Sequence, residues 1–145
     1  MRFHLPRLVN YFPALVLLLL SAGCATRIAV APNAVGLKPS EVSILRLALD
    51  TPGNVATCFA VIFDAKGGEV RRNDNWTESL YQITVKPGPI EVVLLVPGYQ
   101  RLTAYPRAFL VVEPGKTYDF VSTKIMNGEG VNVEYKVAKD EGAKK

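Results

Sequence analysis

The sequence predicts an all-β domain, an antiparallel β-sandwich of about seven strands, and three observations support this prediction. Apolar, β-branched and aromatic residues fall into short runs, and most of these runs alternate with polar residues at a period of two. Turn-forming residues such as Pro, Gly and Asn interrupt the chain at intervals of roughly ten residues. No segment carries a convincing amphipathic helical stripe.

The first predicted strands lie in residues 41–50 and 57–64. The first run is apolar and ends at the Thr-Pro-Gly-Asn turn signal of residues 51–54. The second run is rich in β-branched and aromatic residues, and the turn of residues 65–68 predicts a hairpin-like exit. Alternation within the second run places three side chains on one face: Phe59, Val61 and Phe63.

The polar segment after this turn permits more than one interpretation. Residues 69–75 form either a short edge strand around Val70 or a loop. Asn75 and Glu78 have the spacing of a helix-capping box, which favours a few helical turns over residues 76–80. A few helical turns could therefore interrupt the sandwich here.

Two runs in the middle of the chain flank a Pro-Gly turn. Residues 81–86 alternate between apolar and polar side chains, residues 87–89 interrupt the run, and residues 90–96 resume it. Two strands on either side of such a turn predict a β-hairpin. Further along, residues 109–112 form a short apolar strand that ends at the Glu-Pro-Gly-Lys turn of residues 113–116.

The last predicted strands are residues 118–123 and 131–137, and the second of them has the most regular alternation in the chain. Residues 139–145 are charged and small, which predicts a disordered tail. Across the strands, alternation predicts a core made of Phe59, Val61, Phe63, Tyr81, Ile83, Val85, Val92, Leu94, Tyr118, Phe120 and Val133.

The amino-terminal 40 residues differ from the rest of the chain. Basic residues are followed by the uncharged, apolar run 8–20 and by the small residues 21–23, which directly precede Cys24. This order is typical of the signal peptide of an exported protein. Residues 25–40 are small, polar and interrupted by Pro and Gly, so we expect them to form a linker without regular structure.

The run Leu20-Ser21-Ala22-Gly23-Cys24 resembles the lipobox of bacterial lipoproteins, with Ser21 at a position where that family usually carries Leu. In that family the cysteine thiol receives diacylglycerol, the preceding peptide is removed and the new amino terminus is acylated. The resemblance therefore implies lipid on Cys24 and a membrane as partner. Lipoproteins of enteric type that stay at the inner membrane carry Asp after this cysteine. Ala25 stands here, so we expect the outer membrane, facing the periplasm.

Two other interpretations of this segment remain. The first is an uncleaved membrane anchor, which needs about 20 apolar residues, whereas the run 8–20 is shorter. The second is a plain secretory peptide that an incidental cysteine follows. Acyl chains on Cys24 would anchor the protein to the bilayer without spanning it. The predicted organisation is a signal peptide, a lipidated terminus with linker, a β-sandwich domain and a charged tail: residues 1–23, 24–40, 41–138 and 139–145.

Two further segments resemble known envelope modules. The stretch Ile83-Thr84-Val85-Lys86-Pro87-Gly88-Pro89-Ile90-Glu91-Val92-Val93-Leu94 looks like the strand, Pro-Gly turn, strand element of PEGA-type and transthyretin-like domains. The stretch Glu113-Pro114-Gly115-Lys116-Thr117-Tyr118-Asp119-Phe120 resembles the later turn-to-strand element of small bacterial lipoproteins of that kind. The resemblance implies a β-sandwich with an accessory role in the envelope, and it carries over no catalytic residues.

Composition excludes several classes of function. From Cys24 onward the chain has 122 residues, with 15 basic and 13 acidic side chains, so we expect one domain and no nucleic-acid partner. The single histidine, His4, precedes Cys24, so the mature chain cannot build a histidine-dependent catalytic or metal site. We therefore predict no cofactor and no metal. Cys58 lies in an apolar run and is expected to be a buried, unpaired thiol.

The remaining candidate site residues are carboxylates, aromatic residues and arginines. Paired carboxylates can hydrolyse glycans without histidine, but the spacing of Glu69, Asp74, Glu78 and Glu91 predicts no such pair. Trp76, with Arg71 and Arg72, is a candidate contact for a partner or a sugar, or else a core plug. A second patch, which strand-edge packing also explains, comprises Tyr99, Arg101, Tyr105 and Arg107.

These observations predict a non-catalytic, lipid-anchored protein of the bacterial cell envelope that binds or scaffolds another envelope protein. A glycan-binding module and a histidine-independent cell-wall glycan hydrolase are the alternatives. The absence of histidine from the predicted mature chain favours the non-catalytic interpretation.

Overall fold

The computed structural model describes residues 27–73, 79–99, 102–125 and 130–138. In these residues the chain forms two mostly antiparallel β-sheets, and the only helices are two short 3-10 turns, Pro32–Ala34 and Pro39–Glu41. The all-β prediction is therefore confirmed, and the architecture is that of a β-sandwich. None of the helices in the described ranges is long and apolar enough to cross a membrane.

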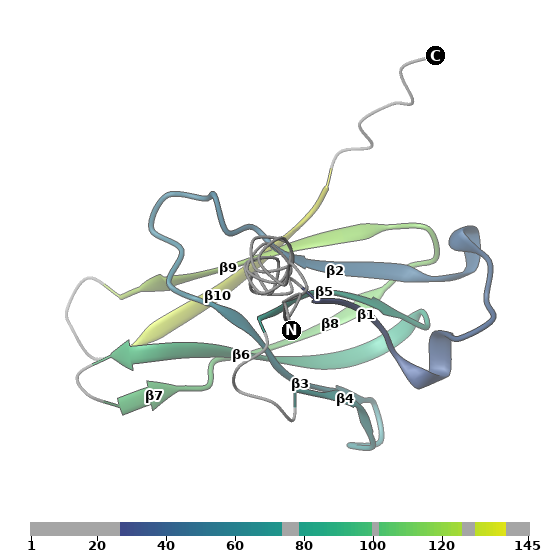
Figure 1. The fold of residues 1–145 in the computed structure, drawn as a ribbon, viewed down its shortest axis with the longest axis horizontal. Helices are drawn as coiled ribbons and strands as arrows, with labels where there is room; N and C mark the ends of the chain where they lie inside the picture. The colour runs from purple at the N-terminus through teal and green to yellow at the C-terminus, as the bar shows by residue number, and fades with distance from the viewer. Residues whose placement is uncertain (1–26, 74–78, 100–101, 126–129, 139–145) are drawn as a thin grey trace, which may run out of the picture.

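The first sheet joins strands from the beginning, middle and end of the chain (Figure 1). The β1–β5 and β2–β9 pairs are parallel, whereas β2–β5 and β9–β10 are antiparallel. In sheet order the strands are β1 (Arg27–Val30), β5 (Leu80–Val85), β2 (Ser43–Leu47), β9 (Thr117–Lys124) and β10 (Val131–Val137).

The second sheet is antiparallel and is built around the long strand β6 (Gly88–Tyr99). On one side β6 pairs with β3 (Cys58–Asp64), which in turn pairs with β4 (Glu69–Arg72). On its other side β6 pairs with β8 (Arg107–Val112) and, near its end, with β7 (Leu102–Ala104).

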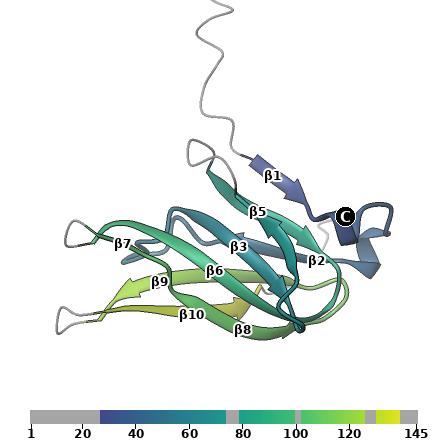
Figure 2. The ribbon, with the colours of Figure 1, turned by 90° about the horizontal axis from the view of Figure 1, so that it is seen from below.

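The inner faces of the two sheets share one hydrophobic core (Figure 2). Phe59 of the second sheet and Phe120 of the first lie at its centre, with their rings edge to face and their centroids 5.7 Å apart. Seven residues of the predicted core are buried on these inner faces: Phe59, Ile83, Val85, Val92, Leu94, Tyr118 and Phe120. Tyr81 and Val133 are partly buried against the same core.

Strand β3 does not keep the regular alternation that the sequence suggests. Its pairing with β6 shifts between Phe59 and Val61, which makes a β-bulge at Ala60. Phe59 and Ile62 therefore face the core between the sheets, whereas Val61 and Phe63 belong to a separate cluster outside it. The prediction that Phe59, Val61 and Phe63 share one face was wrong. The extra residue at the bulge turns the side chains that follow it to the opposite face of the sheet.

The predicted hairpin around the Pro-Gly turn is also corrected. The turn does separate two strands, but β5 pairs with β1 and β2 in the first sheet, and β6 pairs with β3 in the second. The turn carries the chain from one sheet to the other, and Gly88 at its end has φ 137°, which a side chain would disfavour. β5 and β6 each pair with strands that are distant in the sequence, so the local sequence pattern could not predict their partners.

Four further segments refine or correct the sequence predictions. Residues 69–72 form an edge strand, which decides between the two interpretations of that segment. Residues 27–30 of the expected linker form β1, and residues 102–104 form the unpredicted β7. The expected helical turns lie largely outside the described residues, and Leu80 begins β5.

Candidate functional site

One row of four residues crosses the outer face of the second sheet. Strand register places Arg72 of β4 opposite Val61 of β3, Val61 opposite Val93 of β6, and Val93 opposite Arg107 of β8. Three strand spacings separate the two arginines, a distance of about 14 Å between their backbones. The row thus places a cation at each end of an apolar centre.

The adjacent row combines acidic and aromatic residues. Phe63 of β3 lies between Glu69 of β4 and Glu91 of β6, and Glu91 lies opposite Phe109 of β8. Ion pairs join this row to the first. Arg72 Nε donates to Glu69 Oε2 at 2.9 Å, and Arg107 Nη1 donates to Glu91 Oε1 at 2.8 Å. The arginines are therefore held in place beside the apolar centre by carboxylates.

A pocket of about 580 Å³ lies over the first row. Apolar side chains of β3 and β6 line it together with Arg72, Arg107 and the exposed ring of Tyr105, which stands between β7 and β8. Its remaining lining residues are Ala60, Val61, Phe63, Asn73 and Val93. A pocket with an apolar floor and a few polar groups at its rim is suited to binding.

The floor of this pocket rests on a small buried cluster that contains Cys58. The amide of the buried Asn73 donates from Nδ2 to the Cys58 Sγ at 3.6 Å, and its backbone N–H donates to the carbonyl of Ala60 at 2.9 Å. Burial raises the pKa of the Cys58 thiol above its ordinary value, and hydrogen bonds from Thr57 and Asn73 oppose this shift. The thiol is thus protonated and structural, as the sequence predicted for a buried, unpaired cysteine.

Exposed apolar side chains extend this surface along β8. Phe109 is 72% exposed and Val111 66% exposed, and both line a further pocket of about 610 Å³ beside Glu91. We call the two rows, Tyr105 and Val111 together the outer-face surface. It combines arginine, aromatic and aliphatic side chains, the combination that is enriched where proteins bind one another.

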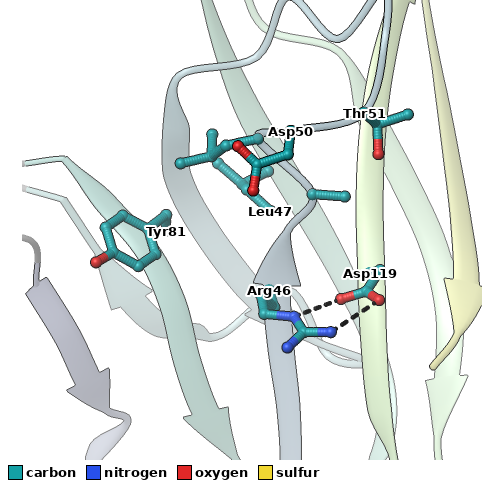
Figure 3. A pocket seen from close by; sticks show the side chains of 8 residues that line it. Arg46, Leu47, Asp50, Thr51, Tyr81 and Asp119 are labelled. Carbon is teal, nitrogen blue, oxygen red and sulfur yellow. Dashed lines mark hydrogen bonds and ion pairs between the residues drawn. The ribbon is translucent and has the colours of Figure 1, made fainter. Parts of the chain in front are cut away.

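A third pocket, of about 530 Å³, lies at the end of β2 in the first sheet (Figure 3). Arg46 forms a two-point ion pair with Asp119 of β9, with Nε to Oδ1 at 2.7 Å and Nη2 to Oδ2 at 3.0 Å. Figure 3 shows Tyr81 and Asp119 on opposite sides of this pocket, with Arg46 turned toward Asp119. The guanidinium is thus paired with a carboxylate of the protein, as those of Arg72 and Arg107 are.

The structure places the predicted site residues as follows. Arg72, Tyr105 and Arg107, which the sequence assigned to two separate patches, line one pocket. Arg71 lies opposite the inward-facing Ile62, so it is on the other face of β4 from Arg72. Tyr99 ends β6 opposite Leu102. Three predicted residues lie outside the described residues: Cys24, Trp76 and Arg101.

The sequence did not identify four residues of this site: Phe63, Asn73, Val93 and Phe109. Phe63 looks like an ordinary core residue of an alternating strand, and only the bulge in β3 shows that it faces outward. Val93 alternates with the core residues Val92 and Leu94, and its pairing with Val61 brings it into the pocket. Phe109 lies in the apolar run 109–112, which does not alternate in the sequence, and only the structure reveals that its ring is exposed.

The candidate carboxylates Glu69 and Glu91 lie on either side of Phe63, two strand spacings or about 10 Å apart at the backbone, and each is paired with an arginine. Asp74 and Glu78 lie outside the described residues. Within the described ranges, no three His, Cys, Asp or Glu side chains gather as they would around a metal ion. Comparisons with known protein families, with curated proteins and with solved structures found no match.

Proposed function

We propose that this chain is a non-catalytic lipoprotein of the bacterial cell envelope, and that it binds another envelope protein through the outer-face surface. The observation that carries the binding proposal is the row in which Arg72 and Arg107 flank Val61 and Val93. Exposed aromatic side chains beside an arginine, here Tyr105 and Phe109 beside Arg107, are typical of the residues that dominate protein interfaces.

The lipid anchor is supported by the sequence that ends at Cys24. An apolar run, three small residues and the cysteine follow one another directly. A Cys24→Ser chain should accumulate as a longer precursor without labelled fatty acid, whereas the wild type should be shortened and labelled. Equal labelling of the two chains would refute lipidation. Ala25 supports the outer membrane as the location, and density fractionation tests it.

A protein partner is supported by the exposed apolar part of the surface. Phe109 and Val111 offer contact area but no hydrogen-bonding groups, and they lie on the same side of β8 as Arg107. Exposed apolar groups that gather in this way mark interaction sites on soluble domains. A glycan-binding module and a glycan hydrolase stay alternatives that the experiments below distinguish.

The test uses the lipidated chain as bait in a detergent extract of the envelope. Phe109→Asp should abolish capture of a stoichiometric protein partner, because it places a charge among the exposed apolar side chains of β8. Val137→Asp is the matched control, since Val137 is also exposed but lies on β10 of the other sheet. Equal capture by both variants would show that the outer-face surface is not the contact.

Three further variants extend the same assay. Trp76→Ala should weaken capture by about 2 kcal/mol with little change in melting temperature if the indole contacts the partner. A large loss of thermal stability with unchanged capture would instead identify Trp76 as a core residue.

If the chain retains or cleaves peptidoglycan fragments, and Tyr105→Ala or Glu91→Gln removes that property, a glycan function replaces the proposed one.

A further inference from the structure

The edge strand β1 presents two large apolar side chains to solvent. Ile28 is 62% exposed and Val30 is 50% exposed, whereas Ala29 between them packs against the core. Alternate residues of a strand point to opposite faces of its sheet. Ile28 and Val30 therefore both point away from the core of the sandwich.

This exposure belongs to a fixed part of the fold. β1 runs parallel to β5, and the backbone N–H of the fully buried Ala31 donates to the carbonyl of Thr84 at 2.8 Å. Two more exposed apolar side chains, Val35 and Leu37, follow on either side of Gly36. We call Ile28, Val30, Val35 and Leu37 the β1 edge patch.

The rest of the outer face of this sheet is largely polar. Strand register continues from Ile28 to Gln82 of β5, then to Arg46 of β2, Asp119 of β9 and Lys136 of β10. The corresponding row from Val30 continues through Thr84 to Ile44 of β2, which is only partly exposed, and to Thr117 of β9. On this face the exposed large apolar side chains, Ile28 and Val30, lie at the β1 edge, which indicates a partner that covers this edge and leaves the polar face in water.

The short stretch of chain between Cys24 and β1 indicates which partner covers this edge. β1 begins three residues after Cys24, and three residues span at most about 11 Å. An apolar protein surface that lies on a bilayer is buried about 5–10 Å into the boundary between headgroups and acyl chains. A lipid on Cys24 would therefore hold β1 within reach of that boundary.

We infer that the β1 edge patch lies in the interfacial region of the bilayer and fixes the orientation of the domain on the membrane. The inference rests on the proposed lipidation of Cys24. In Figure 2, β1 and β8 lie on opposite sides of the sandwich. With β1 on the membrane, β8 and its exposed Phe109 are directed away from the bilayer, where a partner can reach them.

The experiment measures the depth of single positions in the membrane. The lipidated chain is reconstituted in vesicles of phosphatidylethanolamine and phosphatidylglycerol whose acyl chains carry bromine, which quenches bimane on contact. Bimane is attached to Ile28→Cys or to Val35→Cys, and the matched control is Phe109→Cys. All three variants carry Cys58→Ala to remove the other thiol. The three labelled positions are exposed, so the label itself does not disturb the core, and the buried Cys58→Ala change is common to all three variants.

We expect brominated lipid to remove most of the bimane fluorescence at residues 28 and 35 and to leave the signal at residue 109 unchanged. Equal fluorescence at all three positions would overturn the inference. A shielded but unquenched bimane at residue 28 would also overturn it, because a protein, such as a second copy of the chain, would then cover β1.

Mass spectrometry of the amino-terminal peptide separates this inference from the function on which it rests. Acylated Cys24 with no quenching at residue 28 would leave the lipid anchor intact and refute only the docking of β1. An unmodified Cys24 would refute both.

Discussion

Phe59 and Val61 lie two residues apart in β3 but on opposite faces of the second sheet. Phe59 contacts Phe120 in the core between the sheets, whereas Val61 lies opposite Arg72 in the outer-face surface. The bulge at Ala60 produces this reversal, because the pairing with β6 skips one residue there. One extra residue thus places Val61 and Phe63 on the outer face of β3 instead of the core face.

Phe59→Ala and Phe63→Ala should therefore differ strongly in stability. Phe59→Ala should lower the free energy of unfolding by about 3–5 kcal/mol, because it leaves a cavity in a fully buried part of the core. Phe63→Ala should cost only about 1 kcal/mol, since that ring is partly exposed on the outer face. Urea denaturation of the two variants measures the difference, and equal losses would contradict the bulged register.

Asn54 should be the most sensitive residue of the loop after β2. Its Oδ1 accepts hydrogen bonds from the backbone N–H groups of Ala56 and Ser122 at 3.3 and 3.0 Å, and its Nδ2 donates to the Ala56 carbonyl. Asn54→Ala leaves these groups without partners, so we expect a loss of about 2 kcal/mol. Asn54→Asp retains the acceptor and should cost less. Urea midpoints compare the two variants, and an equal loss would show that the acceptor does not matter.

The sequence predicted the positions of the strands better than it predicted which strands pair with one another. Strands β5, β9 and β10 were predictable because alternation is a local property of the chain. Strand β1 has four residues and β7 three, too few for a period to be recognised. The parallel pairing of β1 with β5 joins segments distant in sequence, and no local pattern encodes such a pairing.

The candidate site could be predicted only in part, because its assembly also depends on strand pairing. Arg72, Tyr105 and Arg107 were identified from the sequence as exposed aromatic and basic residues, but in two separate patches. Their convergence depends on the pairing of Val61 with Val93, and hence on the register of β3 against β6. Residue type therefore indicated candidate side chains, whereas the bulge determines which of them lie together.

Arg46 and Asp119 should stabilise the contact between β2 and β9 in a salt-dependent way. Their ion pair is bidentate but partly exposed, with 48% and 23% of the two side chains accessible. Asp119→Asn should therefore cost about 0.5–1 kcal/mol at low salt. A double-mutant cycle with Arg46→Gln measures the coupling energy, which should shrink at about 1 M salt because screening weakens exposed pairs. A coupling that is unchanged by salt would indicate packing instead of charge.

Cys58 should make the stability of the domain fall at alkaline pH. Burial raises the pKa of this thiol from its ordinary value of 9.0, so the folded state keeps its proton at a pH where the unfolded chain has lost it. The unfolded state then binds fewer protons than the folded state, and the free energy of unfolding decreases as pH rises above about 9. The stabilising contribution is complete below that pH, and each further unit removes at most about 1.4 kcal/mol until the folded thiol also ionises.

Cys58→Ala isolates this effect from the other groups that titrate in the same range. Lysines and tyrosines contribute equally to both chains, so the difference between their unfolding free energies reports the thiol alone. We expect urea titrations at pH 7 and at about pH 10 to show a steeper loss in the wild type than in the variant. Parallel losses in the two chains would mean that water reaches the thiol in the folded state, and the pocket floor above Cys58 and Asn73 would then be open.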